Sequence, residues 1–127
     1  MNQGSHMKKI LIADDEKPVR ELVKRLFGHV YKVIEADDGD IAIDIARNSK
    51  PDLILMDIMM PVMDGVEATQ EIRKCKAFKD LPMIALTAHA LKGNRKRFLE
   101  EGLPDYIRKP IKYKLVHSTI EKYKKKK

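Results

Sequence analysis

Five short apolar runs recur along the chain, and their spacing restricts the fold more than any other feature. The runs start 23, 20, 30 and 23 residues apart, and each is too short to be a buried helix. Runs that are apolar on consecutive residues are typical of strands covered on both faces, as in a parallel sheet. The predicted strands are Ile10–Ala13, Val33–Ala36, Leu53–Met56, Met83–Leu86 and Tyr106–Ile107.

The segments between these runs have the spacing of helices that bury one face. The pattern i, i+3, i+4, i+7, i+8 indicates such a helix, and the third segment, from Val66 to Lys74, follows it least cleanly. Alternation of strand and helix through five repeats predicts an α/β fold, a doubly wound five-stranded parallel sheet with helices on both faces. The apolar helical positions are Val19, Leu22, Val23, Leu26 and Phe27; Ile41, Ala42, Ile45 and Ala46; Leu91, Phe98 and Leu99; and Leu115, Val116, Thr119, Ile120 and Tyr123.

The composition restricts the class of protein. A chain of 127 residues with 43% hydrophobic and 35% charged residues suits one soluble domain and excludes intrinsic disorder. No apolar run approaches the roughly 20 residues of a membrane span. The single cysteine, Cys75, excludes an intrachain disulfide and a Cys-built zinc site. These features predict a cytoplasmic protein without a membrane partner.

The net charge of +7 is concentrated at one end of the chain. Lys122 and the run Lys124–Lys127 supply five charges, which leaves +2 for the rest. The run is either a solvated helix terminus, whose positive charges interact favourably with the helix dipole, or a tail that binds nucleic acid or acidic lipid. We favour the solvated terminus over nucleic-acid binding because Tyr123 is the only aromatic residue nearby to stack on a base.

The first residues of the chain resemble a remnant of cloning. Gly4-Ser5-His6-Met7 resembles the scar of an expression vector, so residues 1–6 are interpreted as a tag remnant and residues 7–127 as the domain with its Lys-rich tail. The apolar run Ile10–Ala13 is too short for a signal peptide and is followed by three acids.

Polar residues follow four of the predicted strands. In a parallel sheet the carboxyl ends of the strands meet at one edge, where ligands bind. Each residue alone has an ordinary explanation, such as a helix start for an acidic pair. Together they would place three carboxylates, a hydroxyl and an ammonium group at one site. These polar residues are Asp14-Asp15-Glu16, Asp57, Thr87-Ala88 and Lys109-Pro110.

Three carboxylates at one site imply a cation. Two carboxylates about 4 Å apart repel by about 4 kcal/mol at an effective dielectric constant of about 20. A divalent cation relieves this repulsion, and oxygen ligands favour magnesium or calcium. Magnesium uses few carboxylates and leaves room for phosphate oxygens, so the pattern predicts a magnesium-dependent phosphate site.

With these motifs at its strand ends, the chain resembles the receiver domains of two-component response regulators. The resemblance covers residues 8 to about 123 and is carried by Ile12–Glu16, Leu55–Gly65, Leu86–Ala88 and Lys109-Pro110. It implies a flavodoxin-like (βα)5 fold with strand order 2-1-3-4-5 and a signalling role rather than turnover of a substrate.

The resemblance also implies roles for individual residues. Asp57 is expected to accept the phosphoryl group. Asp15, Asp57 and the backbone carbonyl of Met59 are expected to bind Mg²⁺ directly, and Asp14 through water.

Other residues at the same edge are expected to act on the phosphoryl group. Thr87, the backbone N–H of Ala88 and Lys109 would contact its oxygens, and Lys109 would pair with Asp57 beforehand. The peptide before Pro110 is expected to be cis.

The resemblance further implies partners and a switch. A sensor histidine kinase or a histidine phosphotransfer protein would donate the phosphoryl group, and the segment from Ala85 to Gly102, with His89, is most similar to receivers attached to hybrid sensor kinases. Thr87 would move toward the phosphoryl group and Tyr106 would swing inward behind it. The surface of the fourth helix, fifth strand and fifth helix, bordered by Leu91, Arg95, Arg108 and Tyr113, would then change for a downstream target.

Four other functions remain as alternatives. A phosphohydrolase with an aspartyl-phosphate intermediate needs an acid two residues after its nucleophile, and Met59 cannot serve. A flavin carrier needs a hydroxyl-rich phosphate loop, whereas Asp14-Asp15-Glu16 would repel the phosphate. A receiver that only binds partners would not need the complete set of Asp14, Asp15, Asp57, Thr87 and Lys109. A receiver-fold binding module with nucleic-acid affinity through the basic tail is the last alternative.

Overall fold

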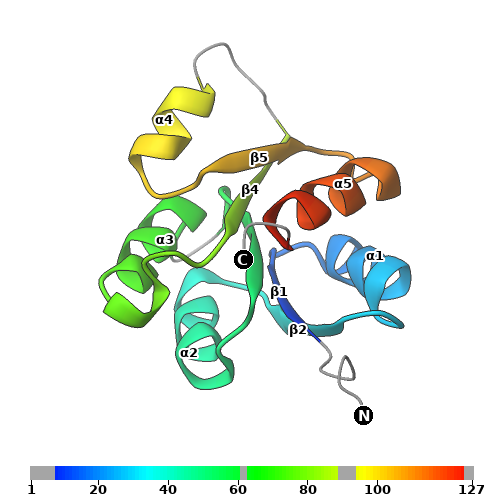
Figure 1. The fold of residues 1–127 in the computed structure, drawn as a ribbon, viewed down its shortest axis with the longest axis horizontal. Coiled ribbons are helices and arrows are strands. Elements are labelled where there is room, and N and C mark those ends of the chain that lie inside the picture. The colour runs from blue at the N-terminus through cyan, green and yellow to red at the C-terminus, as the bar shows by residue number, and fades with distance from the viewer. Residues whose placement is uncertain (1–7, 61–62, 89–93, 125–127) are drawn as a thin grey trace.

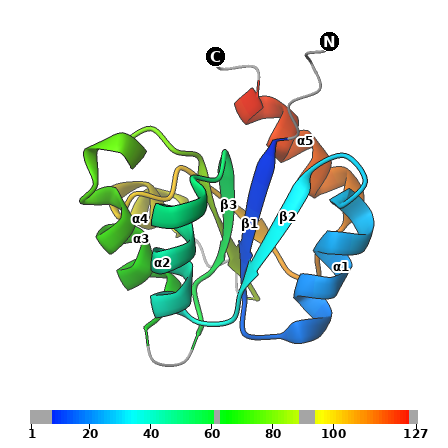
Figure 2. The same cartoon turned by 90° about the horizontal axis from the view of Figure 1, so that it is seen from below.

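A parallel sheet of five strands forms the centre of the molecule (Figures 1 and 2). The computed structural model describes residues 8–60, 63–88 and 94–124. Its strands pair in the order β2-β1-β3-β4-β5, which confirms the predicted fold and strand order. The strands are β1 (Lys9–Ala13), β2 (Lys32–Ala36), β3 (Leu53–Asp57), β4 (Met83–Thr87) and β5 (Asp105–Arg108).

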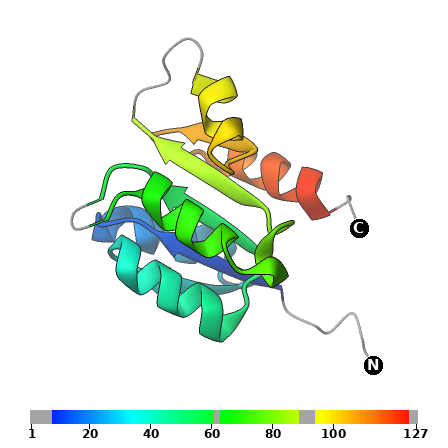
Figure 3. The ribbon, with the colours of Figure 1, turned by 90° about the vertical axis from the view of Figure 1, so that its left-hand side faces the viewer.

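Helices cover both faces of the sheet. One layer contains α1 (Lys17–Phe27) and α5 (Tyr113–Lys124). The opposite layer contains α2 (Gly39–Ser49), α3 (Gly65–Arg73) and α4 (Asn94–Glu100), which Figure 3 views from outside. The short 3-10 helix η2 (Lys76–Phe78) lies between α3 and β4.

Alternate residues of the central strands build two separate cores. On β1, Leu11 and Ala13 belong to the core under α2, α3 and α4, whereas Ile10 and Ile12 belong to the core under α1 and α5. This alternation is the two-residue period of a strand, and it explains why runs covered on both faces are apolar at every position.

The burial of two predicted segments differs from the expectation. β2 is only partly buried because it is an edge strand, and Val33 and Ile34 on it are therefore only partly buried. On α2 the buried residues include Ile43, while Ile41 is 40% exposed. Ile41 lies in the first turn of α2, where its N–H is capped by the Asp38 side chain.

On the last two helices, some of the apolar positions predicted to be buried are buried and others are exposed. Phe98 on α4 is buried, but Leu99 is 60% exposed; on α5 Val116 and Ile120 are buried, but Leu115 is 46% exposed. Leu91 lies outside the described residues. The interpretation of residues 1–6 as a tag remnant also concerns residues outside this part and stays a prediction.

The two ends of the described chain lie at the same edge of the sheet. β1 begins there at Lys9, and α5 ends there because it runs back against the strands (Figure 2). The strands run away from this edge, so the polar residues that follow them lie at the opposite one, the carboxyl edge. None of the helices in the described ranges is long and apolar enough to cross a membrane.

Gly65 allows α3 to start against the end of β3. A Cβ atom at residue 65 would overlap the backbone oxygen of Asp57 and lie 2.8 Å from Cα of Ile58. Asp64 caps this helix by accepting a hydrogen bond from Glu67 N at 2.9 Å. The chain therefore turns tightly from the end of β3 into α3.

Replacing Gly65 tests this close packing. Gly65→Ala is expected to lower the free energy of unfolding by about 1–3 kcal/mol, because the new methyl group overlaps backbone that cannot move without shifting β3. Urea unfolding followed by circular dichroism measures the change. Gln70→Ala, at an exposed position of the same helix, is the control and should change stability by less than about 0.5 kcal/mol.

Candidate functional site

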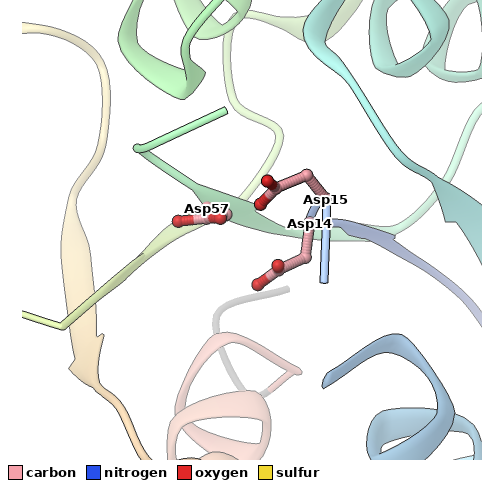
Figure 4. A group of neighbouring side chains, drawn as sticks. All are labelled: Asp14, Asp15 and Asp57. Carbon is pink, nitrogen blue, oxygen red and sulfur yellow. The ribbon is translucent and has the colours of Figure 1, made fainter. Parts of the chain in front are cut away.

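Three aspartates gather at the carboxyl edge of the sheet. Asp14 and Asp15 follow β1, Asp57 ends the neighbouring strand β3, and Figure 4 shows their side chains side by side. One carboxylate oxygen from each lies within 4.8 Å of the other two. The structure therefore brings together the three carboxylates that the sequence predicted to meet.

Local hydrogen bonds hold Asp14 and Asp57. Asp14 N donates to Ala36 O at 3.0 Å, and one carboxylate oxygen of Asp14 accepts from Glu16 N at 2.9 Å. Asp57 Oδ1 accepts from Met59 N at 3.1 Å. Asp14 and Asp57 are buried, at 0% and 3% exposure, while Asp15 is exposed.

Lys109 is the cation of this cluster in the described part of the chain. Its Nζ lies 2.8 Å from Asp14 Oδ2, 3.0 Å from Glu16 Oε1 and 3.5 Å from Asp57 Oδ2. The expected pairing with Asp57 is therefore present, but Asp14 is the closer partner. Sequence reasoning missed the contact with Glu16, because nothing in the pattern indicates that residue 16 turns back over the site.

The backbone places Lys109 beside β4. Lys109 N donates to Thr87 O at 2.7 Å, which extends the pairing of β5 with β4 by one residue. The Lys109–Pro110 peptide is cis, as expected from the sequence.

Burial and charge shift the pKa values at the site. Burial, together with the negative charges of Asp14 and Asp15, raises the pKa of Asp57 to about 7, although the Met59 N–H and Lys109 oppose the shift. Burial opposes the charge of Lys109, but hydrogen bonds with Asp14 and Glu16 and the charge of Asp57 raise its pKa above the usual range. The cluster thus holds a permanent cation beside an acid whose ionisation is disfavoured.

Thr87 and Tyr106 lie on the adjacent strands β4 and β5, and Ala88 follows β4. Thr87 is the buried last residue of β4, and Ala88 after it is exposed. Tyr106 lies beside Ala85 in the parallel register, so Thr87 and Tyr106 are diagonal neighbours on one face of the sheet. The Tyr106 ring contacts the Phe98 ring edge to face at 5.8 Å.

A hollow of about 1060 Å³ lies at the other edge of the sheet. Lys9, Leu53, Pro82 and Tyr123 are among its lining residues, and none of the three clustered aspartates is. Among the described residues, the group of three metal-ligating side chains is the aspartate cluster at the carboxyl edge, outside this hollow.

Comparison with known protein families identifies the family of this chain. The model of the response regulator receiver domain matches residues 10–121. The chain belongs to this family. Receiver domains are signalling domains of two-component systems, and the acidic cluster lies within the matched residues.

The receiver domain is similar to whole response regulators and to parts of larger kinases. It is 36% identical to the polar-differentiation response regulator DivK of Brucella anthropi, covering 91% of the chain and 95% of DivK. It is 42% identical to the hybrid signal transduction histidine kinase I of Dictyostelium discoideum, covering 92% of the chain but 7% of that kinase. For the kinase BarA of Escherichia coli K12, at 35% identity, the chain spans 13% of the length.

Solved receiver structures have the same fold. The chemotaxis protein CheY4 of Vibrio cholerae matches with a TM-score of 0.87 at 27% identity, over 92% of this chain and 98% of that one. The receiver domain of the sensor histidine kinase PA1611 from Pseudomonas aeruginosa matches with a TM-score of 0.84 at 34% identity, over 93% and 98%. That structure has a magnesium ion coordinated in its active-site cleft.

The raised pKa of Asp57 predicts a dependence of stability on pH. Between its unfolded value of 3.8 and about 7, folded Asp57 binds more protons than unfolded Asp57, so the contribution of Asp57 to wild-type stability falls as pH rises. In the presence of chelator, Asp57→Asn should therefore gain stability relative to wild type as pH rises, reaching about 2 kcal/mol near pH 8 after allowance for solvent screening.

Urea unfolding at a series of pH values measures this difference. Asp44→Asn, which changes an exposed carboxylate on α2, is the control and should show a flat difference. A gain for Asp57→Asn that shrinks as pH rises would contradict the assigned electrostatics.

Proposed function

We propose that this receiver domain accepts a phosphoryl group on Asp57 from a phosphohistidine donor and changes shape in response. The single observation that carries the proposal is the cluster of Asp14, Asp15 and Asp57 with Lys109 between them. Such an arrangement of like charges is unfavourable for stability alone, but it suits a reaction that gathers negative oxygens around a cation.

The residues present fit a magnesium ion. Three carboxylates within reach of one cation form an oxygen ligand set, and Asp15 is exposed to solvent, as a site that keeps waters requires. Asp15, Asp57 and the Met59 carbonyl would hold Mg²⁺ directly, and Asp14 through water. When bound, the metal supplies positive charge for the phosphoryl oxygens.

The side chains of this chain perform the transfer. A carboxylate oxygen of Asp57 attacks phosphorus, the new O–P bond forms as the N–P bond of phosphohistidine breaks, and the electron pair leaves with the imidazole nitrogen. Lys109 leaves Asp14 and Glu16 to bind a phosphoryl oxygen. The Thr87 hydroxyl and the Ala88 N–H contact the remaining oxygens.

The same contacts would operate the switch. Thr87 moves toward the phosphoryl group, and Tyr106, its diagonal neighbour, turns into the space behind it. Tyr106 packs against Phe98 of α4, so its movement would change the face formed by α4, β5 and α5. Exposed Arg108 and Tyr113 border this face and would meet a downstream target. Leu91 and the side chain of Arg95 lie outside the described part.

A sensor histidine kinase or a histidine phosphotransfer protein is the proposed donor. The similarity to parts of two histidine kinases supports a place in a phosphorelay within a larger kinase. The similarity to DivK supports a role as a stand-alone response regulator to the same degree. His89, which contributed to the hybrid-kinase resemblance, lies outside the described residues.

Phosphorylation with a small donor tests the acceptor. Incubation with acetyl phosphate and MgCl₂ should add one phosphoryl group, about 80 Da by intact-mass spectrometry, as an acyl phosphate labile to hydroxylamine. Asp57→Asn should abolish the addition, while Asp52→Asn should not, because Asp52 lies at the opposite edge of the sheet. Full labelling of Asp57→Asn would place the acceptor elsewhere.

Replacing Thr87 separates phosphorylation from its consequence. Thr87→Ala should still be phosphorylated within about tenfold of the wild-type rate, because Asp57 and Lys109 remain, but the Tyr106 ring should keep its resting environment. Nuclear magnetic resonance (NMR) of the Tyr106 ring with and without beryllofluoride measures the switch. A wild-type Tyr106 signal that beryllofluoride leaves unchanged would refute the mechanism.

A further inference from the structure

Arg20 connects the acidic turn after β1 to the edge strand β2. Its Nη1 donates to the backbone oxygen of Asp14 at 2.9 Å, and its Nε donates to Glu35 Oε1 at 3.1 Å. The Arg20 side chain is only 14% exposed. One guanidinium group on α1 therefore contacts both the backbone of a predicted metal-site residue and a carboxylate on β2.

The contacted carbonyl lies where strand pairing ends. Asp14 N still donates to Ala36 O, at 3.0 Å, but β1 and its register with β2 end at Ala13. A buried backbone oxygen requires a hydrogen-bond donor, and Arg20 supplies one to Asp14. The peptide from Asp14 to Asp15 carries this oxygen, so the same bond restrains the direction in which the Asp15 side chain leaves the backbone.

Glu35 orients the guanidinium for this contact. It binds Arg20 through Oε1 and Lys24 through Oε2, at 3.1 and 3.0 Å. Burial opposes its charge, but these hydrogen bonds and the two cations lower the pKa of Glu35. Because the planar guanidinium donates in fixed directions, holding Nε on Glu35 aims Nη1 at the Asp14 carbonyl.

We propose that Arg20 is a positioning residue for magnesium binding, acting through the Asp14–Asp15 peptide without touching the ion. This inference rests on the proposed function. Residues that orient metal ligands through hydrogen bonds typically change metal affinity by a factor of ten or more when they are removed.

The test compares Arg20→Ala with Lys24→Ala. Both variants remove a cation that pairs with Glu35, but only Arg20 contacts Asp14. Titration with MgCl₂ followed by NMR should give a dissociation constant about tenfold higher for Arg20→Ala and within about twofold of wild type for Lys24→Ala. The acetyl phosphate rate of Arg20→Ala should approach that of wild type when Mg²⁺ is saturating.

A second measurement uses the metal-free protein. Glu16 N donates to the Asp14 carboxylate, so its hydrogen exchange reports whether the turn keeps its shape. Exchange at Glu16 should be about tenfold faster in Arg20→Ala than in Lys24→Ala. Arg20→Lys, which retains the charge but lacks the guanidinium fork, should give intermediate values and guards against loss of folding in the alanine variant.

The outcomes separate the two proposals. If wild type binds Mg²⁺ and Arg20→Ala binds it as tightly as Lys24→Ala does, the inference is overturned and the proposed function stands. If wild type neither binds Mg²⁺ nor is phosphorylated, the proposed function fails and the inference fails with it. Faster exchange at Glu16 together with weaker Mg²⁺ binding, in Arg20→Ala alone, supports the inference.

Discussion

The balance of charge between Lys109 and the buried carboxylates determines the electrostatics of the carboxyl edge of the sheet. Asp14 and Asp57 are almost fully buried; burial disfavours ionisation of Asp57 most, and repulsion from Asp14 and Asp15 adds to the effect. Lys109 offsets part of this repulsion by contacting both carboxylates and Glu16. The parallel sheet makes the conflict unavoidable, because β1 and β3 are neighbours and deliver their terminal carboxylates to one place. In the proposed reaction, this unfavourable arrangement of charges favours the binding of a metal ion and a phosphoryl group.

Most of the fold could be predicted from the sequence because its strands are buried on both faces. Runs such as Leu53–Met56 are apolar at every position, and the structure adds only Asp57 to that strand. The burial of single helix positions was harder to predict. Ile41 and Ile43 have the same polarity, and only the start of α2 at Gly39 decides which of them faces the core.

The candidate site shows the same division. Asp14, Asp57 and Lys109 were predictable because each lies at the carboxyl end of a strand, and topology alone brings strand ends together. The contacts of Glu16 and Arg20 were not predictable, because they depend on the path of a turn and on the rotation of α1 about its axis. Charged residues at or near the start of a helix have many ordinary roles, so their positions carry no signal until the backbone is known.

The shared edge at which β1 begins and α5 ends has an architectural consequence. The first and last described elements, β1 and α5, begin and end on the side of the sheet opposite the carboxyl edge (Figure 2), whereas Asp57 ends β3 at that carboxyl edge. A receiver built this way can be joined to a larger polypeptide on that side without the connecting chain crossing the three clustered aspartates. In the proposed reaction, the length of a linker would set how often the domain meets its donor, through local concentration, while leaving the geometry of the encounter unchanged.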